Sequence, residues 1–282
     1  MEENTTEPAL PECAEDERID TVNEQITLIQ KRDGLTFGTD AYLLAAFLRP
    51  APRARAVELG AGTGIISLLA ATREKLHDTV AVEIQPAFAA LCERNVRLNH
   101  LTDRIRTLCA DVRDLSAETL GYECDLVYSN PPYMRTDAGL PNANVGKNVA
   151  RHETAGGISE FCAAASRLLK YGGTFAVVYR PDRLPELMAA LHAHGLAPKR
   201  MTFVAADTKT APSMVLIESK KDAAPAMTLT PTLLLYRDTP TSGAREMTDA
   251  ARAVYDTCAL YPIQSPKKKN GRPSAVSEEV ST

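Results

Sequence analysis

Long apolar runs are absent from this 282-residue sequence: no stretch approaches the roughly 18 apolar residues that a membrane-spanning helix needs. The first twenty residues hold eight carboxylates and a single base, Arg18. A secretory signal peptide has a basic start followed by an apolar stretch, so this segment does not resemble one. These absences predict a protein that works in the cytoplasm without contacting a membrane.

Closely paired cysteines are also missing. The six cysteines show no C-x-x-C spacing, and several fall in apolar patterns. Zinc sites and disulfide frameworks use such pairs, so we expect buried free thiols and no metal site.

The excess of positive charge typical of nucleic-acid-binding proteins is lacking, because the formal net charge is −4 at pH 7. The acids are concentrated, however, in the first twenty residues, and the remainder is slightly basic. Phosphate contacts depend on local cations. The acidic total therefore makes RNA binding less expected without excluding it.

Strand-like and helix-like stretches alternate along the chain, which predicts an α/β fold with a parallel sheet and helices on both faces. Two closing strands near 200–204 and 213–218 suggest an antiparallel partner at the sheet edge. Length and a hydrophobic content of 44% suit one α/β domain with a small appendage, or at most two domains. We predict an acidic disordered tail over 1–18, a domain over 19–262 and a basic, then acidic, flexible tail over 263–282. The expected strands are 55–59, 79–83, 105–110, 124–129 and 174–179, and the expected helices are 40–48, 64–75, 86–99, 157–170 and 182–194.

The most informative stretch runs from Asp125 to Tyr133, where an apolar strand leads into Asn130, Pro131, Pro132 and Tyr133. The asparagine oxygen and the proline carbonyl are acceptors, and proline has no N–H. Tyrosine offers a flat face for a planar group. Such a set suits a planar substrate with an NH2 group, whose lone pair the acceptors can aim at an electrophile. Taken alone, the four residues fit an Asn-Pro turn that merely ends the strand about as well as they fit a site for an amine.

Three further signals follow strand ends upstream. Gly60, Gly62 and Gly64 form a G-x-G-x-G turn, which differs from the G-x-G-x-x-G of dinucleotide folds. The next strand ends in Glu83, where a carboxylate can accept both hydroxyls of a ribose. A third strand reaches Asp111, which could receive an adenine amine. Together with the Asn-Pro-Pro-Tyr motif, these signals predict a site for S-adenosylmethionine, whose sulfonium activates its own methyl group without a metal.

With these motifs the chain resembles class I methyltransferases that carry N-P-P-Y, and within them the bacterial tRNA(Val) adenosine N6-methyltransferase family. Residues 34–41, the Ala-Arg-His-Glu of 150–153, residues 179–187 and residues 198–200 carry the narrower resemblance. It spans about residues 20–260. It implies a Rossmann-like fold with a seven-stranded, mostly parallel sheet whose last strand is antiparallel.

From the motifs and the resemblance we expect an enzyme that methylates the exocyclic amine of an adenosine in the anticodon loop of a tRNA. Asn130 and the Pro131 carbonyl would hold the amine, and Tyr133 would stack on a base that is flipped out or unpaired. Pro132 completes the catalytic motif. The residues expected at the cofactor are Thr39, Asp40, Glu58, Gly60, Gly62, Thr63, Gly64, Glu83, Ile84, Asp111 and Asn130.

Two groups of cations are candidate phosphate contacts. Arg135, Lys147 and Arg151 lie in or near a polar stretch, 134–157, that is long for an ordinary connection. The C-terminal tail adds a basic arm with Lys267, Lys268, Lys269 and Arg272. A tail without a role remains nearly as well supported.

Two other functions stay open. The N-P-P-Y motif is shared with enzymes that methylate a glutamine side chain in release factors, so protein N-methylation is the alternative with the same chemistry. A nucleic-acid-binding module without catalysis is the alternative of another class. Intact Glu83, Asp111, Asn130 and Tyr133 argue against that module, since a decayed site should show substitutions.

Overall fold

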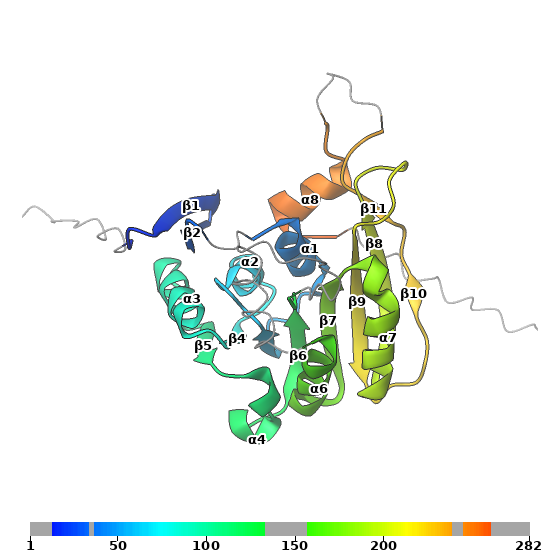
Figure 1. Ribbon diagram of the computed structural model, residues 1–282, viewed down its shortest axis with the longest axis horizontal. Coiled ribbons are helices and arrows are strands. Elements are labelled where there is room, and N and C mark those ends of the chain that lie inside the picture. Colours follow the sequence, from blue (N-terminus) through cyan, green and yellow to red (C-terminus); the bar gives the residue numbers. More distant parts are fainter. Residues whose placement is uncertain (1–12, 34–36, 133–156, 239–244, 261–282) are drawn as a thin grey trace, which may run out of the picture.

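Alternating strands and helices build one twisted sheet in the computed structural model, which describes residues 13–33, 37–132, 157–238 and 245–260 (Figure 1). Within these residues the sheet has nine strands in the order β10-β8-β9-β7-β6-β3-β4-β5, with β11 also paired to β8. The strands are β3 (Arg55–Leu59), β4 (Asp78–Glu83), β5 (Ile105–Cys109), β6 (Cys124–Ser129), β7 (Leu169–Tyr179), β8 (Leu196–Ala205), β9 (Met214–Lys221), β10 (Thr228–Leu229) and β11 (Leu233–Leu234).

The predicted α/β class and the mostly parallel sheet are confirmed. Strands β3 to β7 pair in parallel, whereas β9 is antiparallel to both β7 and β8. The seven long strands match the predicted number, and the two-residue strands β10 and β11 were not predicted. The expected edge position of the antiparallel strand was wrong. Strand β9 lies inside the sheet, because β7 and β8 pair with its backbone on both sides and β8 takes the outer place among the long strands.

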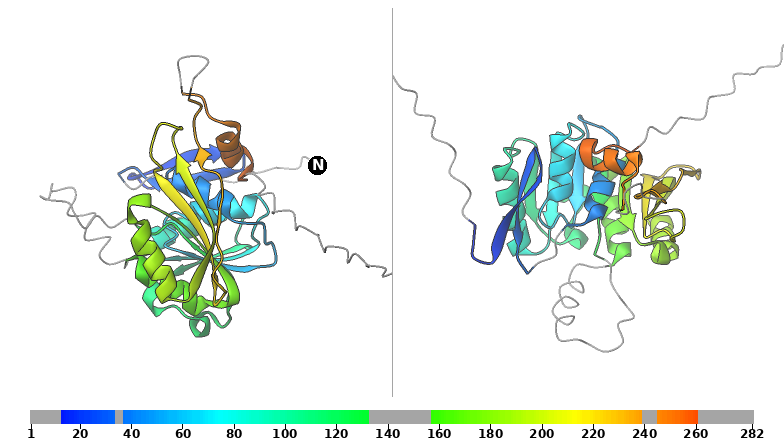
Figure 2. Two further views of the ribbon diagram at one scale, coloured as in Figure 1. Left: turned by 90° about the vertical axis from the view of Figure 1, so that its right-hand side faces the viewer. Right: turned by 90° about the horizontal axis from the view of Figure 1, so that it is seen from above.

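Helices cover both faces of the sheet (Figures 1 and 2). One face packs against α1 (Thr39–Phe47), α2 (Ile65–Thr72) and α3 (Pro86–Leu98), and the other against α6 (Ile158–Leu168) and α7 (Leu184–Ala193). Side chains of β3 alternate between these two cores, with Ala56 in the first and Val57 and Leu59 in the second. Glu58 therefore points to the α2 side. The remaining helices are α4 (Ala117–Leu120), α8 (Asp249–Thr257) and the short 3-10 turns η1 (Val112–Asp114) and η2 (Pro181–Arg183).

An N-terminal hairpin of β1 (Glu17–Asn23) and β2 (Ile26–Lys31), which was not predicted, lies against α3 (Figure 2). Side-chain amides in α3 and at the residue that follows it hold the hairpin. Asn95 accepts from the Ile29 N–H at 2.7 Å and donates to the Ile29 carbonyl at 3.1 Å, and Asn99 bonds Thr27 in the same way. Asn95 also donates to the Thr63 carbonyl at 3.0 Å. The hairpin, α3 and the glycine-rich turn are thereby joined through one buried side chain.

Helix α1 is held at its C-terminal end by two buried cations. Lys75 Nζ donates to the carbonyls of Ala45, Ala46 and Leu48 at 2.8, 3.1 and 2.9 Å, and Arg200 donates to the Phe47 carbonyl at 2.6 Å. These carbonyls have no partner inside the helix, so the cations satisfy them and favour the negative end of the helix dipole. The C-terminal end of α1 is thereby tied to Lys75, which precedes β4, and to Arg200 of β8.

All six cysteines are free thiols. Four of them are buried, as predicted, and Cys13 and Cys109 are exposed. Among the helices of the described residues, none has the length and apolar character needed to cross a membrane.

Candidate functional site

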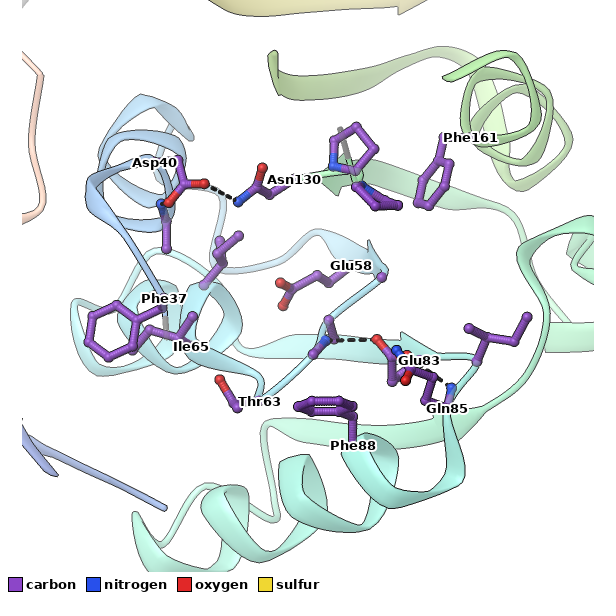
Figure 3. A pocket seen from close by; sticks show the side chains of 18 of the residues that line it. Phe37, Asp40, Glu58, Thr63, Ile65, Glu83, Gln85, Phe88, Asn130 and Phe161 are labelled. Carbon is purple, nitrogen blue, oxygen red and sulfur yellow. Dashed lines mark hydrogen bonds between the residues drawn. The ribbon is translucent and has the colours of Figure 1, made fainter. Parts of the chain in front are cut away.

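A pocket of about 440 Å³ opens where β3, β4 and β6 end, a size typical of small-molecule sites (Figure 3). It is enclosed by the carboxyl ends of the strands, the glycine-rich turn, the first turns of α1 and α3, and one side chain of α6. The lining residues are Phe37, Gly38, Asp40, Ala41, Glu58, Gly60, Ala61, Gly62, Thr63, Ile65, Ile66, Glu83, Ile84, Gln85, Phe88, Val112, Asn130, Pro131, Pro132 and Phe161.

The glycine-rich turn exposes backbone to the pocket. Gly62 has a φ of 56°, and a Cβ built there would meet nothing within 4 Å, so the site of closest approach stays open to a ligand. Gly64 has a φ of 83°, and a Cβ there would lie 2.6 Å from the sulfur of Cys92. Glycine at 64 is thus required for packing against α3, whereas glycine at 62 leaves room on the pocket side.

The Glu83 carboxylate organises one side of the pocket. One oxygen accepts from the Gly62 N–H and the other from the Gln85 N–H, each at 2.9 Å. The residue is only 6% exposed and lines the pocket. A carboxylate in this position, after the second strand of the βαβ unit, is suited to accept the two hydroxyls of a ribose.

Glu58 is a buried acid at the centre of the pocket (Figure 3). It accepts from the Ser67 N–H at 3.1 Å and from the Ser67 hydroxyl, which also contacts the Tyr128 hydroxyl at 2.7 Å. Burial raises the pKa of the Glu58 carboxyl to about 8, although the bonds from Ser67 favour the charged form. The acid is therefore mostly neutral at pH 7 in the folded protein and charged in the unfolded chain.

This difference predicts that Glu58 makes folding stability fall as the pH rises from about 4.5 to about 8. The folded pKa lies above the unfolded one, so the stabilisation is complete below 4.5 and is lost as the folded pKa is passed, with a slope of at most about 1.4 kcal/mol per pH unit. Urea unfolding of the ligand-free protein across this range, compared with Glu58→Gln, should show a slope that the variant lacks. The exposed Glu186→Gln is the control, and parallel curves for Glu58→Gln and the parent would contradict the assignment.

Asn130, at the end of β6, faces Asp40 of α1 across the pocket wall (Figure 3). The Nδ2 of Asn130 donates to Oδ2 of Asp40 at 2.8 Å. The two residues are 90 positions apart in the sequence. Pro131 and Pro132 continue the wall beyond Asn130.

Most of the residues predicted for the site line this one pocket: Asp40, Glu58, Gly60, Gly62, Thr63, Glu83, Ile84, Asn130, Pro131 and Pro132. The predicted Thr39, Gly64 and Asp111 are not among its lining residues. The Thr39 hydroxyl accepts from Tyr255 of α8 at 3.0 Å, and the Asp111 carboxylate caps η1 and pairs with Arg113. Their roles at a ligand stay predictions. Tyr133, Arg135, Lys147, Arg151 and the basic tail lie outside the described residues.

Several apolar lining residues were not identified from the sequence. Phe88 lies in the first turn of α3, five positions after Glu83, and that spacing could have indicated it. Phe161 comes from α6, and its ring is 3.4 Å from the position of a Cβ at Gly60. No local pattern marks Phe161, since it reaches the pocket only through the packing of α6 on the sheet.

Comparison with known proteins shows which family the chain matches. Residues 32–194 match the family model of the methyltransferase small domain. The relatives that the chain matches include proteins named tRNA1(Val) (adenine(37)-N6)-methyltransferase. The one from Bacteroides fragilis is 29% identical over 194 residues, which are 69% of this chain and 81% of the relative. The one from Porphyromonas gingivalis is 30% identical over 187 residues, which are 64% of this chain and 72% of the relative.

Solved structures share the fold. A predicted O-methyltransferase from Agrobacterium tumefaciens superposes with a TM-score of 0.63 at 22% identity, over 80% of this chain and all of that one. The tRNA m1G37 methyltransferase of M. jannaschii gives a TM-score of 0.51 at 15% identity, over 74% of this chain and 58% of that one. At these identities the likeness concerns the Rossmann-like architecture alone.

Proposed function

The chain belongs to the methyltransferase small domain family and, within it, to the bacterial tRNA1(Val) (adenine(37)-N6)-methyltransferases, and from this premise we propose that it methylates the exocyclic amine of an adenosine in a tRNA anticodon loop. One observation carries the proposal. Asn130, the acceptor suited to an amine, lines the same pocket as Glu83 and the glycine-rich turn (Figure 3). Substrate amine and cofactor can therefore meet in a single cavity.

The cofactor of this methyltransferase is S-adenosylmethionine, which supplies a methyl group on a sulfonium centre. The pocket fits its parts. Glu83 offers acceptors for the ribose hydroxyls, and Ile84, Phe88 and Val112 offer apolar surface for the adenine ring. The Glu58 carboxyl lies on the remaining wall, where it can hydrogen-bond the amino-acid end of the cofactor.

Asn130 and the Pro131 carbonyl supply the chemistry at the substrate side. Two acceptors hold the two hydrogens of the amine, favour a pyramidal nitrogen and direct its lone pair into the pocket. Neither group can take up a proton at neutral pH. None is needed during the transfer, because the methylated amine can lose its proton afterwards to water. These residues contribute by positioning the substrate amine, and such positioning can supply a large part of an enzyme's rate enhancement.

The residues that follow Pro132 in the sequence, together with the basic tail, suit an RNA substrate whose base is unpaired. A loop base can be splayed out and stacked on an aromatic ring at little cost, whereas a helical base must first be unpaired. Tyr133 would supply that ring. Arg135, Lys147, Arg151 and the basic residues of the C-terminal tail would contact flanking phosphates. A tRNA substrate also agrees with the expectation that this protein acts in the cytoplasm.

The test is methyl transfer from labelled cofactor to three acceptors: a tRNA transcript with an adenosine 3′ of the anticodon, the same transcript with guanosine at that position, and a release factor. We expect N6-methyladenosine by nucleoside mass spectrometry in the first transcript only, with poor turnover on free adenosine. Total tRNA from a strain lacking the gene should lose that nucleoside. Methylglutamine in the release factor, with unlabelled tRNA, would overturn the proposal in favour of protein methylation.

A further inference from the structure

We propose that Asp40 is a positioning residue that sets the orientation of the Asn130 amide for the substrate amine. The inference rests on the proposed function, in which Asn130 binds that amine as an acceptor. Asp40 reaches Asn130 from the first turn of α1, and the Nδ2 to Oδ2 distance is 2.8 Å. The contact joins the first turn of α1 to the end of β6 (Figure 3).

An asparagine amide has two ends of nearly equal shape and opposite hydrogen-bonding character. Its oxygen accepts, while its NH2 group only donates. An NH2 end turned toward the substrate amine would place donor against donor and misdirect the nitrogen lone pair. A catalytic asparagine of this kind therefore needs a neighbour that distinguishes its two ends.

The Asp40 carboxylate makes that distinction because it can only accept. With Nδ2 of Asn130 bound to Asp40, the amide oxygen occupies the other branch of the side chain. A half-turn of the amide would bring its oxygen against the negatively charged carboxylate and exchange a charge-assisted bond for a repulsive contact. The reversed orientation is thereby disfavoured before any substrate binds.

The position of Asp40 itself is well determined. Its second oxygen, Oδ1, accepts from the Ala41 N–H at 2.9 Å, so each carboxylate oxygen has a donor. A Cβ at Gly38 would lie 2.9 Å from Oδ1, and glycine there leaves space for the carboxylate. Lys75 and Arg200 secure the far end of the same helix. Gly38→Ala should accordingly displace the carboxylate and lower activity in the same way as a change at Asp40.

A charge exchange between the two residues tests the inference. We expect Asp40→Asn to lower the single-turnover rate roughly tenfold at saturating cofactor and tRNA, since an amide at position 40 no longer selects one orientation of Asn130. Asn130→Asp should be impaired more strongly at pH 8, because two carboxylates about 3 Å apart cannot both be ionised without a large penalty. In the double variant, the amide introduced at position 40 can donate to the carboxylate introduced at position 130, whose other oxygen then faces the amine.

The expected signature is a reversal of sign in this double-mutant cycle. Asp40→Asn should lower the rate in the parent background and raise it at least about tenfold in the Asn130→Asp background, with the cofactor dissociation constant within about threefold throughout. Asp249→Asn is the matched control. It removes a carboxylate from the first turn of α8, outside the pocket, and should leave the rate unchanged.

Two results separate this inference from the function on which it rests. If Asn130→Ala abolishes turnover but Asp40→Asn has the same effect in both backgrounds, or acts only through weaker cofactor binding, Asp40 does not position Asn130 and the inference is overturned. If Asn130→Ala retains normal turnover, the proposed role of Asn130 is wrong, and the positioning role is overturned with it.

Discussion

Replacing Asn130 with alanine is expected to lower the rate of methyl transfer about 10²–10³-fold while the cofactor binds with nearly unchanged affinity. Asn130 is the acceptor proposed for the substrate amine. The groups that anchor the turn next to the cofactor, Glu83 and the Gly62 N–H, bond each other and do not depend on Asn130. The variant should therefore affect the chemical step rather than the first binding step.

The measurement pairs single-turnover transfer of a labelled methyl group to tRNA with calorimetry of cofactor binding. Ser129→Ala next in the chain is unsuitable as a control, because the Ser129 hydroxyl bonds the Leu59 carbonyl at 2.7 Å inside the sheet. The exposed Asp182→Asn, in the turn η2 that follows the neighbouring strand β7, removes a surface ion pair instead. A loss of cofactor affinity in Asn130→Ala, with a normal rate at saturating cofactor, would assign Asn130 to the cofactor rather than to the amine.

Replacing Glu83 with alanine should have the opposite kinetic signature, with the cofactor dissociation constant raised roughly 10- to 100-fold and the saturated rate far less changed. Two losses combine in this variant. The carboxylate no longer accepts the ribose hydroxyls, and the N–H groups of Gly62 and Gln85 lose their acceptor. The glycine-rich turn then has to become ordered when the cofactor binds, and this ordering lowers the affinity for the cofactor.

Calorimetry of Glu83→Ala and Glu83→Gln measures both contributions. Glutamine keeps one side-chain oxygen, so its affinity should fall between those of the parent and the alanine variant. Glu93→Ala on the exposed side of α3, where Glu93 pairs with Arg97, is the control and should bind normally. Parental affinity in Glu83→Ala would mean that the ribose lies elsewhere in the pocket.

Local patterns were enough to predict the strands that carry the site. Each parallel strand is a short apolar run ending in a polar or glycine-rich turn, and parallel strands bring those ends to one edge. Glu58, Glu83 and Asn130 could thus be placed together before the fold was known. The β1–β2 hairpin was missed, because its first strand is acidic and polar, and its stability depends on the amides of Asn95 and Asn99 in a helix more than sixty positions away.

The sequence by itself determined the family, the α/β class and the residue types at the strand ends, since these depend on neighbours along the chain. Tertiary structure alone decided which of those groups face one another. Strand β9 enters the sheet between β7 and β8, Phe161 reaches the pocket from α6, and Asp40 meets Asn130 across 90 positions. Such contacts arise from how helices pack on a sheet, and packing is not encoded in any local spacing. From the sequence, Asp40 was predicted only as a residue near the cofactor. In our proposal it orients the catalytic amide, because the tertiary structure brings it into contact with Asn130.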